Sequence, residues 1–283
     1  MLDRFQRSWD LASACMDLLM EEKALIAFPF LASIGIAVVT LSFAVPLVPT
    51  FTLFWSSGAE HTISPLTYVA LFVFYWIQFS LIIFFNTALV EVAMRRFDGE
   101  DASIGDGLRR ALSMLPVILT YAFIAATVGT LLRLIAQRVG FIGRLVVGAI
   151  GFLWTVAVAL VVPVLAAEDV GPVEAIQRSV ELIKRAWGED LIGSVGIGLV
   201  FGIVMAVMVI AGGMVVIATF SVGNVGLATA LLALLVLGVS LVALAQATLQ
   251  GIYAAALYRY ASGDDAIGDM DRRLLESAFQ PRR

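Results

Sequence analysis

Residues 191–218 read LIGSVGIGLVFGIVMAVMVIAGGMVVIA, a run that contains no charged residue and no proline. A helix needs about 20 apolar residues to cross the roughly 30 Å hydrocarbon core of a bilayer. The run exceeds that length, and it lacks the strict alternation of a membrane-spanning β-strand. Because a helix pairs its backbone amides and carbonyls internally, this segment predicts a transmembrane helix.

Five further stretches have the same character. The chain of 283 residues is 61% hydrophobic and 14% charged, with a mean hydropathy of +0.98, which excludes an ordinary soluble domain. We therefore predict an all-α membrane protein with six transmembrane helices. The six predicted spans run approximately from Ala24 to Val48, Leu66 to Met94, Leu112 to Leu132, Leu145 to Ala167, Leu191 to Ala218 and Val225 to Leu257.

The basic residues indicate an orientation. All but three of the 18 Lys and Arg residues lie in the N-terminal segment, the second and fourth connections and the C-terminal segment. The three exceptions, Arg133, Arg138 and Arg144, belong to the third connection. Since cytoplasmic loops are enriched in Lys and Arg, both termini are predicted to be cytoplasmic.

Amphipathic patterns precede the first, third and fifth spans. Apolar residues recur at spacings of three and four over residues 5–19 and 173–187, which predicts helices with one apolar face. A shorter stripe covers residues 104–115, and Ser103 with Asp106 predicts a capping box at its start. We expect these helices to lie on the cytoplasmic side.

Short internal matches predict a repeat. QRSWDL at 6–11 matches QRSVEL at 177–182, and IGDGLRRAL at 104–112 matches IGDMDRRLL at 267–275. We predict three parallel units, each with one cytoplasmic amphipathic helix followed by two spanning helices. The units cover about 1–94, 95–167 and 168–257, and 258–283 forms a cytoplasmic amphipathic tail.

Three prolines lie near the predicted cytoplasmic ends of spans. Pro29, Pro116 and Pro163 each lack an amide hydrogen and clash with the carbonyl four residues earlier. We expect them to shape elbows between amphipathic and spanning helices.

The composition excludes most known chemistry. One cysteine and one histidine allow no disulfide framework and no common zinc site. The spans supply no catalytic triad and no carboxylate cluster facing the bilayer, and a net charge of −4 gives no basic surface for nucleic acid. We predict no catalytic residue, no metal and no cofactor, and a protein that is not an enzyme.

Polar side chains within the predicted spans are candidate site residues, because buried polar groups in a bilayer are costly and often functional. They line a polar pathway or bind lipid or substrate in one interpretation. In the other, which we favour, they join helices by hydrogen bonds, and Glu91 pairs with Arg95 four residues later. The candidates are Gln78, Asn86, Glu91, Gln246 and Gln250.

The third connection and the fifth span offer two weaker features. Arg133, Arg138 and Arg144 contact lipid headgroups on the outer side in one interpretation, and anchor helix ends in the other, more common one. Gly198 and Gly202 have the spacing that allows close approach of two helices. Such packing occurs within one chain or between copies in a homo-oligomer.

Four segments carry a resemblance to a known family. They are RSWDLA at 7–12, EEKALIAFPFL at 21–31, FFNTALVEVAMRRFDGEDASIGDGLRRA at 84–111 and VVPVLAAEDVGPVEAIQRSVELIKRAWGED at 161–190. The chain resembles a prokaryotic family of multi-span membrane proteins of unknown function, from about Phe5 to Arg259. The block at 171–189 is also loosely similar to the membrane region of some bacterial glycerophosphodiester phosphodiesterases. The resemblance implies a multi-pass protein of the prokaryotic plasma membrane, and it supplies no catalytic or ligand residues.

The sequence therefore leaves two alternative functions. The first is a non-catalytic multi-pass protein in the lipid bilayer whose cytoplasmic helices pack the bundle or dock a cytoplasmic protein. The alternative is a transporter, channel or lipid-handling permease with Asn86, Gln246 and Gln250 near a central path.

Overall fold

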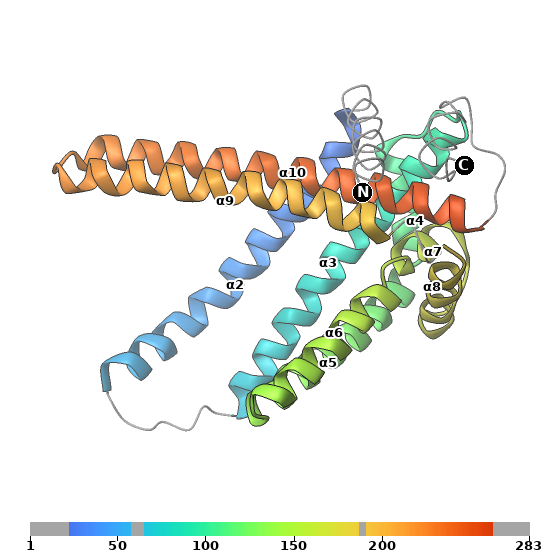
Figure 1. Ribbon diagram of the computed structural model, residues 1–283, viewed down its shortest axis with the longest axis horizontal. Helices are drawn as coiled ribbons and strands as arrows, with labels where there is room; N and C mark the ends of the chain where they lie inside the picture. The colour runs from blue at the N-terminus through green and yellow to red at the C-terminus, as the bar shows by residue number, and fades with distance from the viewer. Residues whose placement is uncertain (1–22, 58–64, 187–190, 263–283) are drawn as a thin grey trace. The chain divides into compact units, whose positions relative to one another are not determined.

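The computed structural model describes residues 23–57, 65–186 and 191–262, which form helices joined by short turns and no strand (Figure 1). The predicted amphipathic helix at 5–19 and most of the predicted tail at 258–283 lie outside these residues. The helices are η1 (Lys23–Ile26), α2 (Ala27–Ser57), α3 (Pro65–Phe97), α4 (Ile104–Ser113), α5 (Leu115–Arg138), α6 (Phe141–Ala157), α7 (Val161–Ala167), α8 (Pro172–Ala186), α9 (Leu191–Ser221) and α10 (Val225–Ser262).

Six segments of the described residues are long and apolar enough to cross a membrane, which confirms the predicted number by length and composition. Their outer surfaces are apolar too: Leu41, Leu145 and Ile217 are each more than half exposed. Hydrocarbon surrounds a spanning helix and does not penalise such exposure. The six segments are Ala24–Ala44, Val69–Phe97, Leu115–Arg138, Phe141–Ala167, Val200–Ser221 and Val225–Arg259.

The fourth span is not one continuous helix, in contrast to the single run over 145–167. Helix α6 ends at Ala157 and α7 begins at Val161, with a turn between them. Pro163 cannot donate to the carbonyl of Ala159, which lies four residues earlier, so an unbroken helix would lose a hydrogen bond here. The break replaces it with a tight turn in which the amide of Val161 donates to the Val158 carbonyl at 3.1 Å.

The other two prolines also lie at changes of helix. Pro116 is in the first turn of α5, after a break from α4 at Met114. Pro29 is in the first turn of α2, directly after the short 3-10 helix η1. Proline is tolerated at a helix start, where its missing amide hydrogen leaves no bond unmade.

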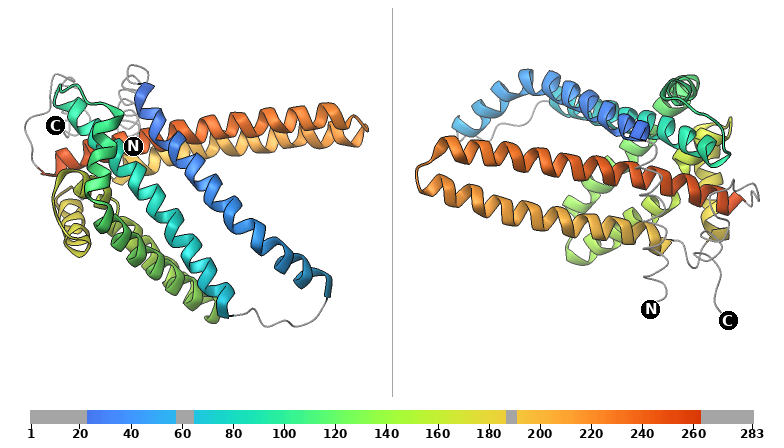
Figure 2. Two further views of the ribbon diagram at one scale, coloured as in Figure 1. Left: turned by 180° about the vertical axis from the view of Figure 1, so that it is seen from behind. Right: turned by 90° about the horizontal axis from the view of Figure 1, so that it is seen from above.

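The chain divides into two compact units. One contains residues 27–92 and 102–185, and its helices α5 and α6 form an antiparallel hairpin (Figure 2). Helix α3 contacts α2 on one side and α5 on the other. The rings of Phe43 and Phe74 have centroids 5.4 Å apart, and so have those of Phe72 and Phe123.

The other unit contains residues 1–26, 93–101 and 186–283. Helices α9 and α10 run antiparallel and side by side along their lengths (Figures 1 and 2). Gly223 lies in the turn between them with φ of +82°, a conformation that glycine adopts without strain. The two helices approach each other closely at Gly212, where an added Cβ would lie 2.6 Å from Leu235 Cδ1.

Candidate functional site

Helix α4 crosses α3 at very short range. A Cβ added to Gly107 would lie 2.5 Å from the Ala88 carbonyl oxygen and 2.8 Å from Val92 Cγ2. The helix begins with the predicted capping box, which is confirmed. The Asp106 amide donates to Ser103 Oγ at 3.3 Å and the Ser103 amide to Asp106 Oδ2 at 3.0 Å. The cap fixes where α4 begins, and Gly107 lets it lie against α3.

Arg110 joins α4 to the carboxyl end of α7. Its Nε donates to the Ala166 carbonyl at 2.8 Å, and its Nη2 donates to the carbonyls of Leu165 and Glu168 at 3.4 and 3.1 Å. Its Nη1 forms an ion pair of 2.5 Å with Asp169. The last carbonyls of a helix lack amide partners, and a cation there is favoured by the helix dipole. Arg110 thus caps α7 from a helix more than fifty residues away.

Helix α8 holds the other end of α7. The hydroxyl of Ser179 is fully buried and accepts a hydrogen bond of 3.1 Å from the amide of Leu160, the residue that precedes α7. Leu182, one turn later on α8, is also fully buried. Arg178 contacts Glu168 Oε1 at 3.2 Å, just beyond the end of α7. We call α4, α7 and α8, joined through Arg110, Ser179 and Arg178, the interfacial cluster.

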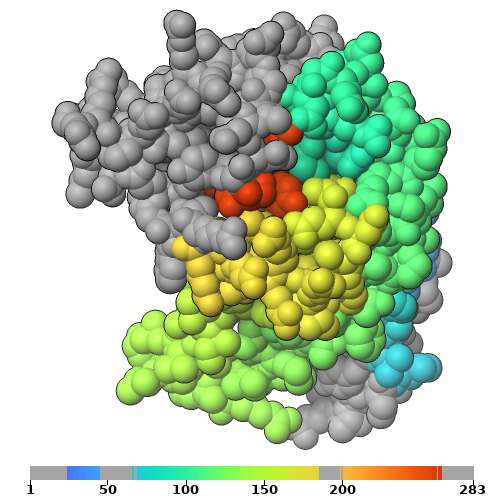
Figure 3. Space-filling view, turned by 90° about the vertical axis from the view of Figure 1, so that its right-hand side faces the viewer, coloured from blue at the N-terminus to red at the C-terminus, as the bar shows by residue number. Residues whose placement is uncertain are grey.

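The opposite face of α8 is open. Figure 3 shows the side of α8 (yellow) that faces away from this packing. Its exposed side chains are mixed in charge, with Val173 as the large apolar member at 57% exposure. The exposed residues are Val173, Glu174, Gln177, Glu181 and Lys184.

In the other unit, a second arginine contacts the end of a helix. Arg259, in the last turn of α10, donates from Nη1 to the Met94 carbonyl at 3.4 Å and from Nη2 to Asp98 Oδ1. Its side chain is 9% exposed, so the ion pair is largely shielded from water. Arg259 therefore holds the carboxyl end of α3 as Arg110 holds that of α7.

The predicted polar residues on α3 are held by the protein in different ways. Gln78 donates from Nε2 to Thr40 Oγ1 at 2.9 Å and so links α3 to α2, while its Oε1 is buried and has no hydrogen-bond partner among the described residues. Asn86 is half-buried, and Glu91 is buried at 8% exposure. The bond of Gln78 is of the kind that the structural interpretation expects.

The predicted polar residues on α10 lie in the unit that contains α9. Gln246 is half-buried and Gln250 is exposed. The Gln250 amide nitrogen lies 4.0 Å from where a Cβ on Gly198 would be, so this side chain lies against α9. Gly202 has open space beside it, whereas the tight contact of the hairpin is at Gly212, which the small-residue spacing did not indicate.

The three arginines of the third connection gather at the turn between α5 and α6. Arg133 approaches the Tyr75 hydroxyl at 3.5 Å. Arg138 ends α5, Arg144 lies in the first turn of α6, and both are exposed. The predicted headgroup contacts of these arginines stay a prediction.

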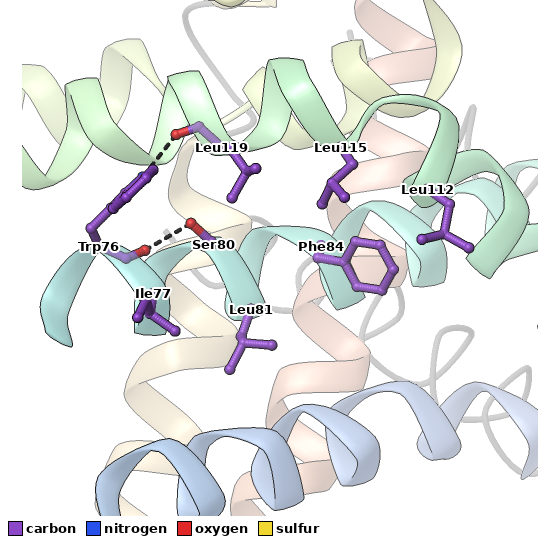
Figure 4. A pocket seen from close by; sticks show the side chains of 8 residues that line it. All are labelled: Trp76, Ile77, Ser80, Leu81, Phe84, Leu112, Leu115 and Leu119. Atoms are coloured by element: carbon purple, nitrogen blue, oxygen red, sulfur yellow. Dashed lines mark hydrogen bonds between the residues drawn. The ribbon is translucent and has the colours of Figure 1, made fainter. Parts of the chain in front are cut away.

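An apolar groove of about 350 Å³ lies where α3 faces α5, a feature that the sequence did not indicate (Figure 4). None of the predicted polar residues lines it. Trp76 donates from Nε1 to the Leu119 carbonyl at 2.9 Å, and Ser80 Oγ donates to the Trp76 carbonyl at 2.8 Å. The lining residues are Trp76, Ile77, Ser80, Leu81 and Phe84 of α3, Leu112 of α4, and Leu115 and Leu119 of α5.

The residues that hold the interfacial cluster together were not identified from the sequence. Arg110 resembles its exposed neighbour Arg109, and only the α4 stripe, which turns Ala111 inward, separates them. Ser179 was part of the QRSVEL match, but nothing in the sequence tells that its hydroxyl meets Leu160. Both contacts join segments that are distant in the chain.

Comparisons with known proteins place the chain in a family. The model of a family of unknown function (DUF6159) matches residues 65–268, more than two thirds of the chain. No curated protein and no solved structure matches. The resemblance to a membrane-protein family of unknown function is thereby confirmed, while the prokaryotic origin and the likeness to phosphodiesterase membrane regions stay predictions.

Proposed function

We propose that this chain, which belongs to the DUF6159 family of unknown function, is a non-catalytic multi-pass protein of the prokaryotic plasma membrane. In this proposal its interfacial helices hold the cytoplasmic ends of the spanning helices together and present a docking face to a cytoplasmic protein. The observation that carries the proposal is the interfacial cluster, in which Arg110 and Ser179 hold the two ends of α7.

The contacts of the cluster support a structural role. The Arg110 guanidinium contacts three carbonyls and one carboxylate, so its donors are committed to the protein. Ser179 is fully buried and already accepts the Leu160 amide. Groups that are satisfied and buried in this way stabilise an arrangement and are poor candidates for binding or transforming a substrate.

The orientation and the repeat belong to the same proposal. Both termini, α4 and α8 face the cytoplasm, and three parallel units of one interfacial helix and two spans build the bundle. The excess of Lys and Arg in the corresponding connections supports this orientation. The partner is a cytoplasmic protein that contacts the exposed side of α8, where Val173 lies among charged residues.

Reconstitution tests whether the protein transports lipid or solute. The purified chain is placed in sealed vesicles that contain a fluorescent phosphatidylglycerol and entrapped carboxyfluorescein. The proposal expects lipid flipping and dye release equal to those of vesicles without protein. A protein-dependent flux that disappears when Asn86, Gln246 and Gln250 are changed to Leu would contradict it and favour the transporter or permease.

A further inference from the structure

Most of the groove between α3 and α5 lies within two of the candidate membrane spans. Its α3 wall, from Trp76 to Phe84, is inside the candidate span Val69–Phe97, and Leu115 and Leu119 begin the span of α5. Eight residues of helix between Trp76 and Phe84 correspond to a length of roughly 12 Å. In a bilayer, helices that span the core are surrounded by acyl chains and not by water.

The walls of the groove select an apolar occupant. Both polar side chains in the lining are engaged within the protein, Trp76 with the Leu119 carbonyl and Ser80 with the Trp76 carbonyl (Figure 4). The Trp76 ring also packs edge-on against Phe123, with centroids 5.9 Å apart. The hydrogen bond and the ring contact hold the indole across the end of the groove that is farther from α4.

The volume of the groove favours one hydrocarbon chain over a helix. A 12 Å length of helix about 10 Å wide occupies roughly 900 Å³. The groove offers about 350 Å³, less than the volume of such a helix, so it suits a thinner occupant better than a helix of a partner or of a second copy. A lipid chain is much thinner than a helix and is already present at this depth.

Helix α4, which contributes Leu112 to the groove, carries a cation one turn earlier. Arg109 lies one helical turn before the lining residue Leu112, and residues three apart share a helix face. Its side chain is 82% exposed and makes an ion pair of 3.3 Å with Asp106. A guanidinium has five N–H donors, so Arg109 retains donors for the oxygens of a phosphate. Its neighbour Arg110 is committed to α7.

We propose that the groove between α3 and α5 holds one acyl chain of an anionic phospholipid, whose headgroup phosphate is bound by Arg109. The lipid is a bound component of the structure, not a transported substrate. This binding site does not depend on the proposed docking role of α8.

Trp76 reports on the occupant directly. The full chain with Trp9, Trp55, Trp154 and Trp187 changed to Phe retains Trp76 as its single tryptophan. It is reconstituted in phosphatidylcholine vesicles that contain a small fraction of either bromine-labelled phosphatidylglycerol or bromine-labelled phosphatidylcholine. Bromine on an acyl chain quenches an indole only at short range. We expect the brominated phosphatidylglycerol to quench Trp76 several-fold more than the brominated phosphatidylcholine.

Variants separate the headgroup from the chain. Arg109→Gln is expected to abolish the difference between the two lipids, and Arg138→Gln, at the other end of α5, to leave it unchanged. Leu115→Phe fills the groove and should reduce quenching by both lipids. Leu112→Phe, at a position that is 57% exposed, serves the same purpose if the first variant does not fold.

Three results would overturn the proposal. They are equal quenching by both lipids in the parent protein, quenching that the folded groove-filling variants leave unchanged, and quenching that falls as the ratio of protein to lipid rises. The last result would mean that a second copy covers the groove.

Discussion

At the residue scale, stability depends on polar groups that meet backbone atoms from distant segments. Ser179 is the clearest case, because its buried hydroxyl satisfies the Leu160 amide at a break between two helices. From the sequence, Ser179 is one more polar residue on a helix with an apolar stripe. The hydrogen-bond partner of its hydroxyl depends on the turn that Pro163 imposes and on how α8 packs. Neither can be predicted from the spacing of residues along the sequence.

Ser179→Ala should lower the free energy of unfolding by about 1–3 kcal/mol, because it leaves a buried amide without a partner. Unfolding in mixed micelles, followed by circular dichroism, measures the change. Ser113→Ala is the matched control. It removes an exposed hydroxyl that bonds to the Arg110 carbonyl, and a change of less than about 0.5 kcal/mol is expected. Equal effects of the two variants would contradict the assignment of Ser179.

Arg110→Gln should destabilise the protein by about 2–3 kcal/mol, since hydrogen bonds to a charged donor are stronger than neutral ones. The change in the free energy of unfolding is measured in the same way, in detergent without lipid. Arg109→Gln removes the adjacent, exposed guanidinium and is expected to have little effect on stability there. If Arg109→Gln lowered the free energy of unfolding as much as Arg110→Gln does, the contacts of Arg110 with α7 would not be the source of the stability.

At the element scale, the helices follow from the sequence better than the contacts between them. The long apolar runs predicted α2, α3, α5, α9 and α10, because the thickness of the bilayer sets the length of a spanning helix. The division of the fourth span into α6 and α7 was missed, although Pro163 was expected to shape an elbow. The α3–α5 groove could not be predicted at all, because it depends on how side chains of two helices leave space.

The crossing of α4 over α3 yields a test at this scale. Gly107→Ala places a Cβ 2.5 Å from the Ala88 carbonyl oxygen, and a backbone atom cannot rotate away, so we expect a loss of about 1–3 kcal/mol. Gly105→Ala lies on the same helix with its nearest contact at 3.6 Å. It should stabilise the helix by about 0.5–1 kcal/mol. Thermal unfolding of both variants would show opposite shifts, and shifts of the same sign would contradict the close crossing.

At the scale of the whole molecule, the number of spans and the expected orientation follow from the composition and the charge distribution. Six candidate spans follow from the apolar runs, and the expected orientation follows from where Lys and Arg lie. The role of the interfacial cluster depends on that orientation, because a docking face on α8 serves a cytoplasmic protein only if α8 lies in the cytoplasm. The turn between α5 and α6 must then lie on the outer side.

Cysteine labelling tests this orientation most directly. Cys15→Ser removes the one native cysteine, and a new cysteine is placed either at Gln137, near the turn between α5 and α6, or at Gln177 on α8. A membrane-impermeant maleimide is added to spheroplasts before and after permeabilisation. We predict that the Gln137→Cys protein is labelled in intact spheroplasts and the Gln177→Cys protein only after permeabilisation. Labelling of both from the same side, or in the reverse order, would contradict it.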